Sequence, residues 1–221
     1  MQMKRTAILI DGEWFRLGLS KCLNGFKQPK PALPHGVTAD VMYRNALSAI
    51  EPASEDLYRV FYYDCPPYNG METNPIDGAT VDFKSQKKFH ARNVFLDEMG
   101  KMPFVALRLG VAKARGWRLN DQYVKSTLSG THGPPKASDV FFNLEQKGVD
   151  MRLGIDVATL ALKENVERIV MISGDTDMIP AMKLARREGV QVILVQLKGW
   201  HRLTKQLVED ADLVRPLTPT P

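Results

Sequence analysis

The sequence predicts an α/β protein whose open, mostly parallel sheet is covered by helices on both faces. Short apolar runs of strand length alternate along the chain with longer amphipathic stretches of helical periodicity. The runs Ala7–Ile10 and Ile169–Ile172 contain no polar residue, which is typical of parallel strands buried on both faces. Each run leads into a turn that contains aspartate. Because ligands of open α/β sheets bind beyond the carboxyl ends of the strands, these two turns indicate one shared site.

The first half of the chain is expected to contain two strands and three helices. A strand over Thr6–Ile10 leads to a short helix over Trp14–Lys21, and a proline-containing loop follows over Asn24–Gly36. Thr38 is a suitable N-cap for the next helix, which carries an apolar stripe at helical spacing. The remaining elements of this half are a helix over Ala39–Ile50, a strand over Leu57–Tyr63 and a long helix over Val81–Met99.

The second half is expected to complete the sheet and to carry a flexible loop. The loop, over Ser126–Ser138, is rich in glycine and proline. The elements expected on either side of it are a strand over Phe104–Leu109, an edge strand over Trp117–Val124, an extended segment over Val140–Leu144, a helix over Met151–Lys163, a strand over Arg168–Ile172, a helix over Met178–Glu188 and a strand over Val190–Val195.

Length and composition favour one soluble cytoplasmic domain over residues 1–215, followed by a disordered tail over 216–221. A chain of 221 residues can bury one sizeable core. Cys22 and Cys65 suit a reducing compartment, because they form neither a disulfide framework nor a metal-binding spacing. The apolar run after the basic residues 1–5 is too short for a signal peptide, and no run of 18 apolar residues spans a membrane. The sequence leaves the oligomeric state open, a dimer included.

The charge distribution favours a polyanionic partner. The formal net charge is +5 and the pI is about 9.2. Basic residues crowd two stretches, 84–92 and 101–118, while the aspartates of the turns lie elsewhere. A basic surface around an acidic pocket fits an enzyme that attracts a nucleic acid, although basic runs are also common on solvated faces. The candidate RNA-binding residues are Lys84, Lys87, Lys88, Arg92 and Lys147.

Adjacent carboxylates repel each other, so the turn that holds Asp175 and Asp177 needs compensation. A divalent cation provides it, and hydrogen bonds to a helix N-terminus are the alternative. Asp156 lies in a helix on the same face as two leucines, which calls for a metal, a basic partner or a proton. Asp150 lies six residues earlier and is either the N-cap of that helix or part of the site.

In their order along the chain, these motifs resemble the NYN domain family of the PIN-like nuclease superfamily. The resemblance is carried by strand-Asp-Gly-Glu at Ile8–Glu13, by Lys147–Asp150, by Asp156 within a helix and by Ser173–Asp177. It covers roughly residues 6 to 196, and its specific part is the block from 147 to 177. Segments similar in kind and order lie between these motifs, at Arg59–Asp64 and Leu107–Gly110.

The resemblance implies a Rossmann-like, PIN-like sheet with an acidic pocket that binds Mg²⁺ or Mn²⁺ and cleaves RNA. By motif match the metal ligands and catalytic acids are Asp11, Asp156, Asp175 and Asp177, with Asp150 beside them as a further catalytic candidate. Family members commonly carry asparagine three residues after the first aspartate, where this chain has Trp14. Trp14 can pack in the core, stack on a base or donate its indole N–H.

The reaction implied is metal-assisted hydrolysis of RNA, in which cations held by carboxylates polarise the phosphate and activate a water molecule. Two other readings stay open. The same pocket and basic surface can serve a non-catalytic RNA-binding module. A phosphatase of the haloacid-dehalogenase type also places aspartate after its first strand, but it needs a second acid two residues later in an Asp-x-Asp pattern, where this chain has Glu13.

Overall fold

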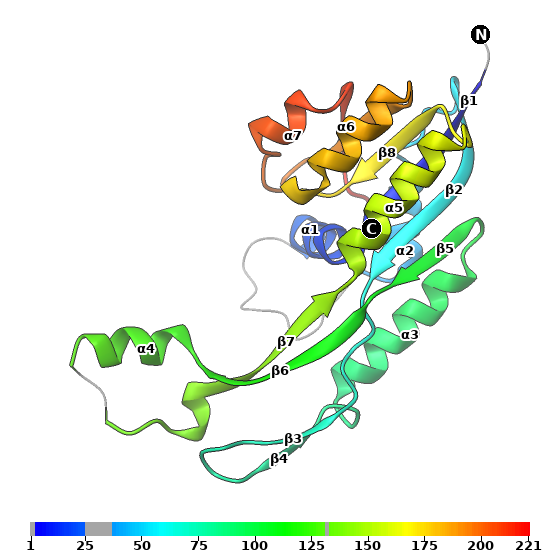
Figure 1. Cartoon of the computed structure of the whole chain (residues 1–221). Coiled ribbons are helices and arrows are strands. Elements are labelled where there is room, and N and C mark those ends of the chain that lie inside the picture. The colour runs from blue at the N-terminus through cyan, green and yellow to red at the C-terminus, as the bar shows by residue number, and fades with distance from the viewer. Residues whose placement is uncertain (1–2, 25–36, 131–132) are drawn as a thin grey trace.

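The computed structural model of the chain, which describes residues 3–24, 37–130 and 133–221, confirms the predicted α/β class. All neighbouring strands of the central six-stranded sheet are parallel, in the spatial order β10-β9-β8-β1-β2-β5. Figure 1 shows this sheet with its helices on both faces. Its strands are β1 (Lys4–Asp11), β2 (Glu55–Asp64), β5 (Val105–Leu109), β8 (Arg168–Ile172), β9 (Gln191–Leu197) and β10 (Leu213–Leu217).

The strand order is that of a Rossmann-like sheet with one topological switch point. The chain starts at β1 in the middle of the sheet and builds outward through β2 to β5. It then returns to place β8 on the free side of β1 and continues outward through β9 to β10. The crevice where the direction of building reverses lies between the carboxyl ends of β1 and β8, and this is where such sheets bind their ligands.

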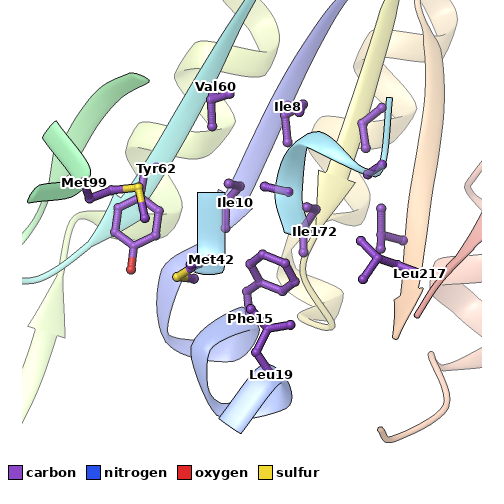
Figure 2. Close-up of a cluster of buried hydrophobic side chains, with 14 of the residues drawn as sticks. Ile8, Ile10, Phe15, Leu19, Met42, Val60, Tyr62, Met99, Ile172 and Leu217 are labelled. Atoms are coloured by element: carbon purple, nitrogen blue, oxygen red, sulfur yellow. The ribbon is translucent and has the colours of Figure 1, made fainter. Parts of the chain in front are cut away.

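Alternate residues of the strands enter two separate cores, one on each face of the sheet. Ile8 and Ile10 of β1 point to the core covered by α1, α2 and α3, and Figure 2 shows part of it. Ala7 and Leu9 point to the opposite core under α5, α6 and α7. The helices are α1 (Gly12–Asn24), α2 (Ala39–Leu47), α3 (Lys87–Lys101), α5 (Val149–Leu162), α6 (Ile179–Arg187) and α7 (Lys205–Glu209).

A long antiparallel hairpin extends away from the sheet. Its strands are β6 (Val111–Leu119) and β7 (Val140–Lys147), and α4 (Asp121–Leu128) lies at its far end (Figure 1). A smaller hairpin, β3 (Met71–Thr73) with β4 (Thr80–Asp82), lies at the same end of the molecule.

Several boundaries differ from those predicted. The expected edge strand over Trp117–Val124 is wrong in its second half, because the Asn120 side chain caps α4 by accepting from the Tyr123 N–H at 2.8 Å. Helix α4 also replaces the first residues of the loop expected over Ser126–Ser138. The long helix starts at Lys87 rather than at Val81, since residues 80–82 pair with β3. The predicted Thr38 cap is present, and its hydroxyl accepts from the Val41 N–H at 3.2 Å.

The tail is ordered, contrary to the expectation of a disordered segment over 216–221. Residues 213–217 form β10 at the edge of the sheet, and Leu217 is buried. Beyond the strand, the Asn45 side chain donates to the Thr220 carbonyl at 2.7 Å and accepts from the Thr220 N–H at 2.9 Å. The loop predicted over Asn24–Gly36 lies almost wholly outside the described residues. Within the described ranges, no helix has the length and apolar character needed to cross a membrane.

Candidate active site

The two aspartate turns lie side by side at the switch point of the sheet. Ile10 of β1 pairs with Ile172 of β8, so the residues that follow them leave the sheet together. The Ser173 hydroxyl donates to Oδ2 of Asp11 at 3.2 Å, and the Trp14 backbone N–H donates to Oδ1 at 3.1 Å. The structure therefore joins residues that are 162 positions apart in the sequence.

Asp11 is only partly exposed, and its surroundings disfavour the ionised carboxylate. Burial raises the pKa of Asp11 from 3.8 to about 6, even though the hydrogen bonds from Trp14 and Ser173 lower it. The negative charges of Glu13 and Asp64 raise it further. A carboxyl with a pKa near 6 exchanges a proton readily at physiological pH, as a general acid or base does.

The turn after β8 holds its two aspartates in different ways. Asp175 caps the short 3-10 helix Thr176–Met178, because its Oδ1 accepts from the Asp177 N–H at 2.9 Å. The Ser173 hydroxyl also accepts from the Asp175 N–H at 3.1 Å, so Ser173 links this turn to Asp11. Asp177 is exposed to solvent.

Asp150 joins this group from the first turn of α5. Desolvation raises the pKa of its carboxyl, and the negative charges of Asp175 and Asp177 raise it further. The carboxyl of Asp150 therefore lies within electrostatic range of Asp175 and Asp177 and is repelled by both. Asp150 is not the N-cap of α5, because that position is taken by Gly148, which has a left-handed backbone conformation.

Asp156, which was predicted to be a metal ligand, is held by residues of the neighbouring strands β2 and β5. Its Oδ2 accepts from the Tyr63 hydroxyl at 2.9 Å and from Nε of Arg108 at 2.8 Å. Arg108 comes from β5, on the side of β2 that faces away from β8. The negative charge of Asp156 is thus compensated by Arg108, which is the basic partner that the sequence analysis gave as one of three alternatives.

The acidic group suits a hard divalent cation in the chemistry of its donors. Carboxylate oxygens are the ligands that Mg²⁺ prefers, and the mutual repulsion of Asp150, Asp175 and Asp177 is what a cation would relieve. In residues 3–24, 37–130 and 133–221, however, no three acidic, histidine or cysteine side chains are grouped closely enough to hold one metal ion. The four matched aspartates are therefore not a preformed ligand set in the described residues.

Sequence reasoning missed Asp64, the acid at the end of β2. Its side chain is buried and is held by the Tyr62 hydroxyl at 2.6 Å, by the Cys65 N–H at 2.7 Å and by an ion pair with Arg92. Asp64 acts on the pKa of Asp11, so it belongs to the electrostatics of the same sheet edge. The sequence could have indicated Asp64 as a site residue, because it ends β2, the strand next to β1, and ligands of such sheets bind at the strand ends.

Glycine residues allow the close packing of these turns. A Cβ atom at Gly12 would lie 2.6 Å from Oδ2 of Asp64, and one at Gly174 would collide with the indole of Trp14. Trp14 packs against the first core and meets Trp200 edge-on at 6.5 Å between ring centroids. Trp14 thus has the packing role that was one of its predicted alternatives.

The predicted RNA-binding residues divide into exposed and buried ones. Lys84, Lys87 and Lys88 are exposed, just before α3 and in its first turn. Lys147, at the end of β7, is exposed and forms an ion pair with Glu145. Arg92 is mostly buried in its ion pair with Asp64, so it does not belong to the exposed lysine surface.

The raised pKa of Asp11 predicts a pH-dependent penalty on folding. Between pH 3.8 and about 6 the native state binds more protons than the unfolded state, so stability falls as the pH rises through this window. In EDTA at pH 8, Asp11→Asn should be more stable than the wild type, by at most about 3 kcal/mol. Denaturant titrations between pH 4 and pH 8 measure the difference, which should vanish toward pH 4. If the free energies of unfolding of the two proteins changed in parallel with pH, the burial assigned to the Asp11 carboxyl would be wrong.

One comparison with known proteins finds a match. A family model described as NYN domain matches residues 76–217, which is more than half of the chain and includes Asp150, Asp175 and Asp177. Asp11 and β1 precede the matched segment. Neither curated proteins nor solved structures give a match.

Proposed function

Since the chain belongs to the NYN domain family, whose members are generally nucleases, we propose that it is a metal-dependent ribonuclease. The reaction proposed is hydrolysis of RNA phosphodiester bonds. The observation that carries the proposal is the hydrogen bond between Ser173 and Asp11 at the switch point of the sheet. It brings two acidic turns together in the crevice where such sheets act on their ligands.

The proposed roles follow from the contacts of each side chain. Asp11, Asp150, Asp175 and Asp177 are the residues that would hold Mg²⁺ or Mn²⁺, and they would have to draw closer together around the cation, because no three of them are grouped closely enough in the described residues. The cation would supply charge neutralisation at the phosphate and lower the pKa of a water molecule.

Ser173 orients Asp11 and the turn, because its hydroxyl bonds to both. Burial keeps part of the Asp11 carboxyl protonated near neutral pH, so Asp11 must release this proton in order to bind the cation. Asp156 accepts from Tyr63 and Arg108, which supports a positioning role for it rather than a place among the ligands.

The proposed partner is RNA, attracted by the exposed lysines Lys84, Lys87, Lys88 and Lys147. Positive charge at the entrance of an acidic site concentrates a polyanion there and orients it. The phosphatase alternative loses support, because it needs Glu13 to serve as the second catalytic acid, two residues after Asp11. Glu13 is exposed and instead accepts from the Gln146 side chain on β7 at 2.6 Å.

Cleavage of labelled RNA by the purified protein tests the proposal. Single-stranded and hairpin RNAs should both be offered, in Mn²⁺, in Mg²⁺ and in EDTA. We expect shortened products with either cation and intact RNA in EDTA. Binding of RNA without cleavage in any cation would favour the non-catalytic RNA-binding module. Release of phosphate from a small phosphomonoester with no action on RNA would favour the phosphatase.

Salt dependence tests whether the exposed lysines contact phosphates. Neutralising four phosphates of a single strand should make log K fall against log salt with a slope of about −3. Binding is measured in Ca²⁺, so that turnover does not obscure the titration. Lys87→Ala with Lys88→Ala should reduce the steepness and weaken binding to all sequences alike, since phosphate contacts carry no sequence information. An unchanged slope in this variant would place the RNA on another surface.

A further inference from the structure

A cavity of about 680 Å³ lies beside the acidic edge and is not used by the proposed reaction. It opens where the hairpin β6–β7 meets α3 and the end of β2. Asp64 forms part of its wall, and the carboxyl of Asp11 interacts electrostatically with Asp64, so the cavity adjoins the acidic site. Its volume lies within the range of small-molecule sites, which are typically apolar with a few placed polar groups.

Two arginines line the cavity, Arg16 of α1 and Arg92 of α3, and in the described residues only Arg92 forms an ion pair with the Asp64 carboxylate. Nε of Arg16 and Nη1 of Arg92 are buried and have no hydrogen-bond acceptor in the described part of the chain. The Asp64 carboxylate does not accept from either atom: one of its oxygens accepts from Tyr62 and from Nη2 of Arg92, and the other from the Cys65 N–H. A buried N–H group without an acceptor is costly, and here two such donors belong to cations.

The charges of the cavity also call for an anion. Burial lowers the pKa of Arg16, and the positive charge of Arg92 lowers it further. Lys88, which is exposed, adds a third cation to the lining, while Glu98 is the second acid. An anion placed between the two guanidinium groups would accept from the free N–H groups and reduce their repulsion. Arginine binds phosphate in this way, with several N–H groups directed at its oxygens.

The rest of the lining suits a flat, apolar group. Tyr68, Phe83, Phe89 and Phe95 all contribute to the walls. Tyr68 and Phe83 pack edge-to-face at 5.4 Å between ring centroids, so this wall is fixed by its own contacts. Nucleic-acid bases stack on aromatic side chains without regard to sequence.

We propose that this cavity is a binding site for a nucleoside phosphate, with the phosphate on Arg16 and Arg92 and the base against the aromatic wall. The site takes a free nucleotide or one nucleotide unit of an RNA strand, since both present the same chemistry. It does not require cleavage at the acidic edge, and the two proposals can fail separately.

Titration calorimetry with adenosine 5′-monophosphate, in EDTA, tests the site. We expect this nucleotide to bind more tightly than adenosine or inorganic phosphate, because each of these offers only half of the contacts. Arg16→Met should weaken binding at least about tenfold, the loss expected for one charge-assisted hydrogen bond. Because Arg16 has no ion pair in the described residues and is repelled by Arg92, this variant should melt no lower than the wild type.

Two further variants complete the test. Lys88→Met removes an exposed cation of the lining and should weaken binding without affecting the fold. Arg187→Met is the matched control, since Arg187 is exposed, lies outside the cavity and should leave binding unchanged. Absence of binding at millimolar nucleotide, or an affinity that neither Arg16→Met nor Lys88→Met lowers, would overturn the proposal.

Competition identifies the source of the nucleotide. Displacement of a fluorescent RNA oligonucleotide by adenosine 5′-monophosphate would assign the site to a unit of the strand. Nucleotide binding without displacement would assign it to a free nucleotide. Asp175→Asn should bind the nucleotide as the wild type does, so a protein that binds it without cleaving RNA would refute only the proposed nuclease activity.

Discussion

Asp175→Asn is expected to lower the rate of RNA cleavage in Mn²⁺ by roughly 10²–10³-fold while leaving the protein folded. The substitution removes one negative charge from the group formed with Asp150 and Asp177, and with it part of the affinity for a cation. Asparagine is as good an N-cap as aspartate, so the bond from the Asp177 N–H is retained. Single-turnover cleavage measures the rate, and thermal melting in EDTA measures the stability, which should be equal or higher because repulsion is reduced.

Asp40→Asn is the matched control for this charge removal. Asp40 is exposed on α2, where it forms an ion pair with Arg44, which is itself exposed. We expect this variant to cleave RNA at the wild-type rate. If Asp175→Asn melts earlier than the wild type and retains full activity, Asp175 serves only to cap its turn and the proposed role is wrong.

Arg92→Met is expected to give the largest loss of stability, about 3–5 kcal/mol. Only 1% of the Asp64 side chain is exposed, so removing Arg92 leaves a buried carboxylate without its countercharge. For a chain of this length such a loss lowers Tm by roughly 10 °C or more. Denaturant unfolding measures it.

An exposed pair provides the comparison for Arg92. Arg44→Met breaks the pair with Asp40, in which both side chains are at least half exposed. Surface pairs of this kind contribute little, so we expect a change of at most about 0.5 kcal/mol. Equal losses in the two variants would mean that Asp64 is hydrated and that the cavity beside it is filled with water.

The parallel sheet was predictable because its signals are local and strong. Each central strand is a short apolar run between breakers, and the two aspartate turns followed from their places after β1 and β8. The hairpin β6–β7 and α4 were harder to predict. Their residues are largely half-buried or exposed, so hydrophobic periodicity is weak there. The tail was expected to be disordered because chain ends commonly are, whereas pairing with β9 and contacts with Asn45 decide its structure.

Part of the site could be predicted from the sequence. The residues that follow strands were predictable, whereas those held by contacts distant in sequence were not. Asp11, Asp175 and Asp177 follow strands and needed no tertiary information to be placed at one edge. Asp156 shares the polarity of a ligand, but its partner Arg108 is 48 residues away in sequence, and no local pattern reveals that contact. The cavity lined by Arg16 and Arg92 could not be predicted from local sequence patterns either, because α1, α3 and the hairpin meet only in the folded chain.

The switch point also sets the order in which the acidic site can be assembled during synthesis. β1 leaves the ribosome early, but its partner β8 lies more than 150 residues later, and Ser173 follows β8. A nascent chain that ends before residue 168 leaves the β8 side of β1 unpaired, and Asp11 lacks the hydrogen bond from Ser173. Contacts of such long sequence separation form late and slowly. The acidic centre therefore forms only when the C-terminal third has been synthesised, and an incomplete chain lacks the assembled centre.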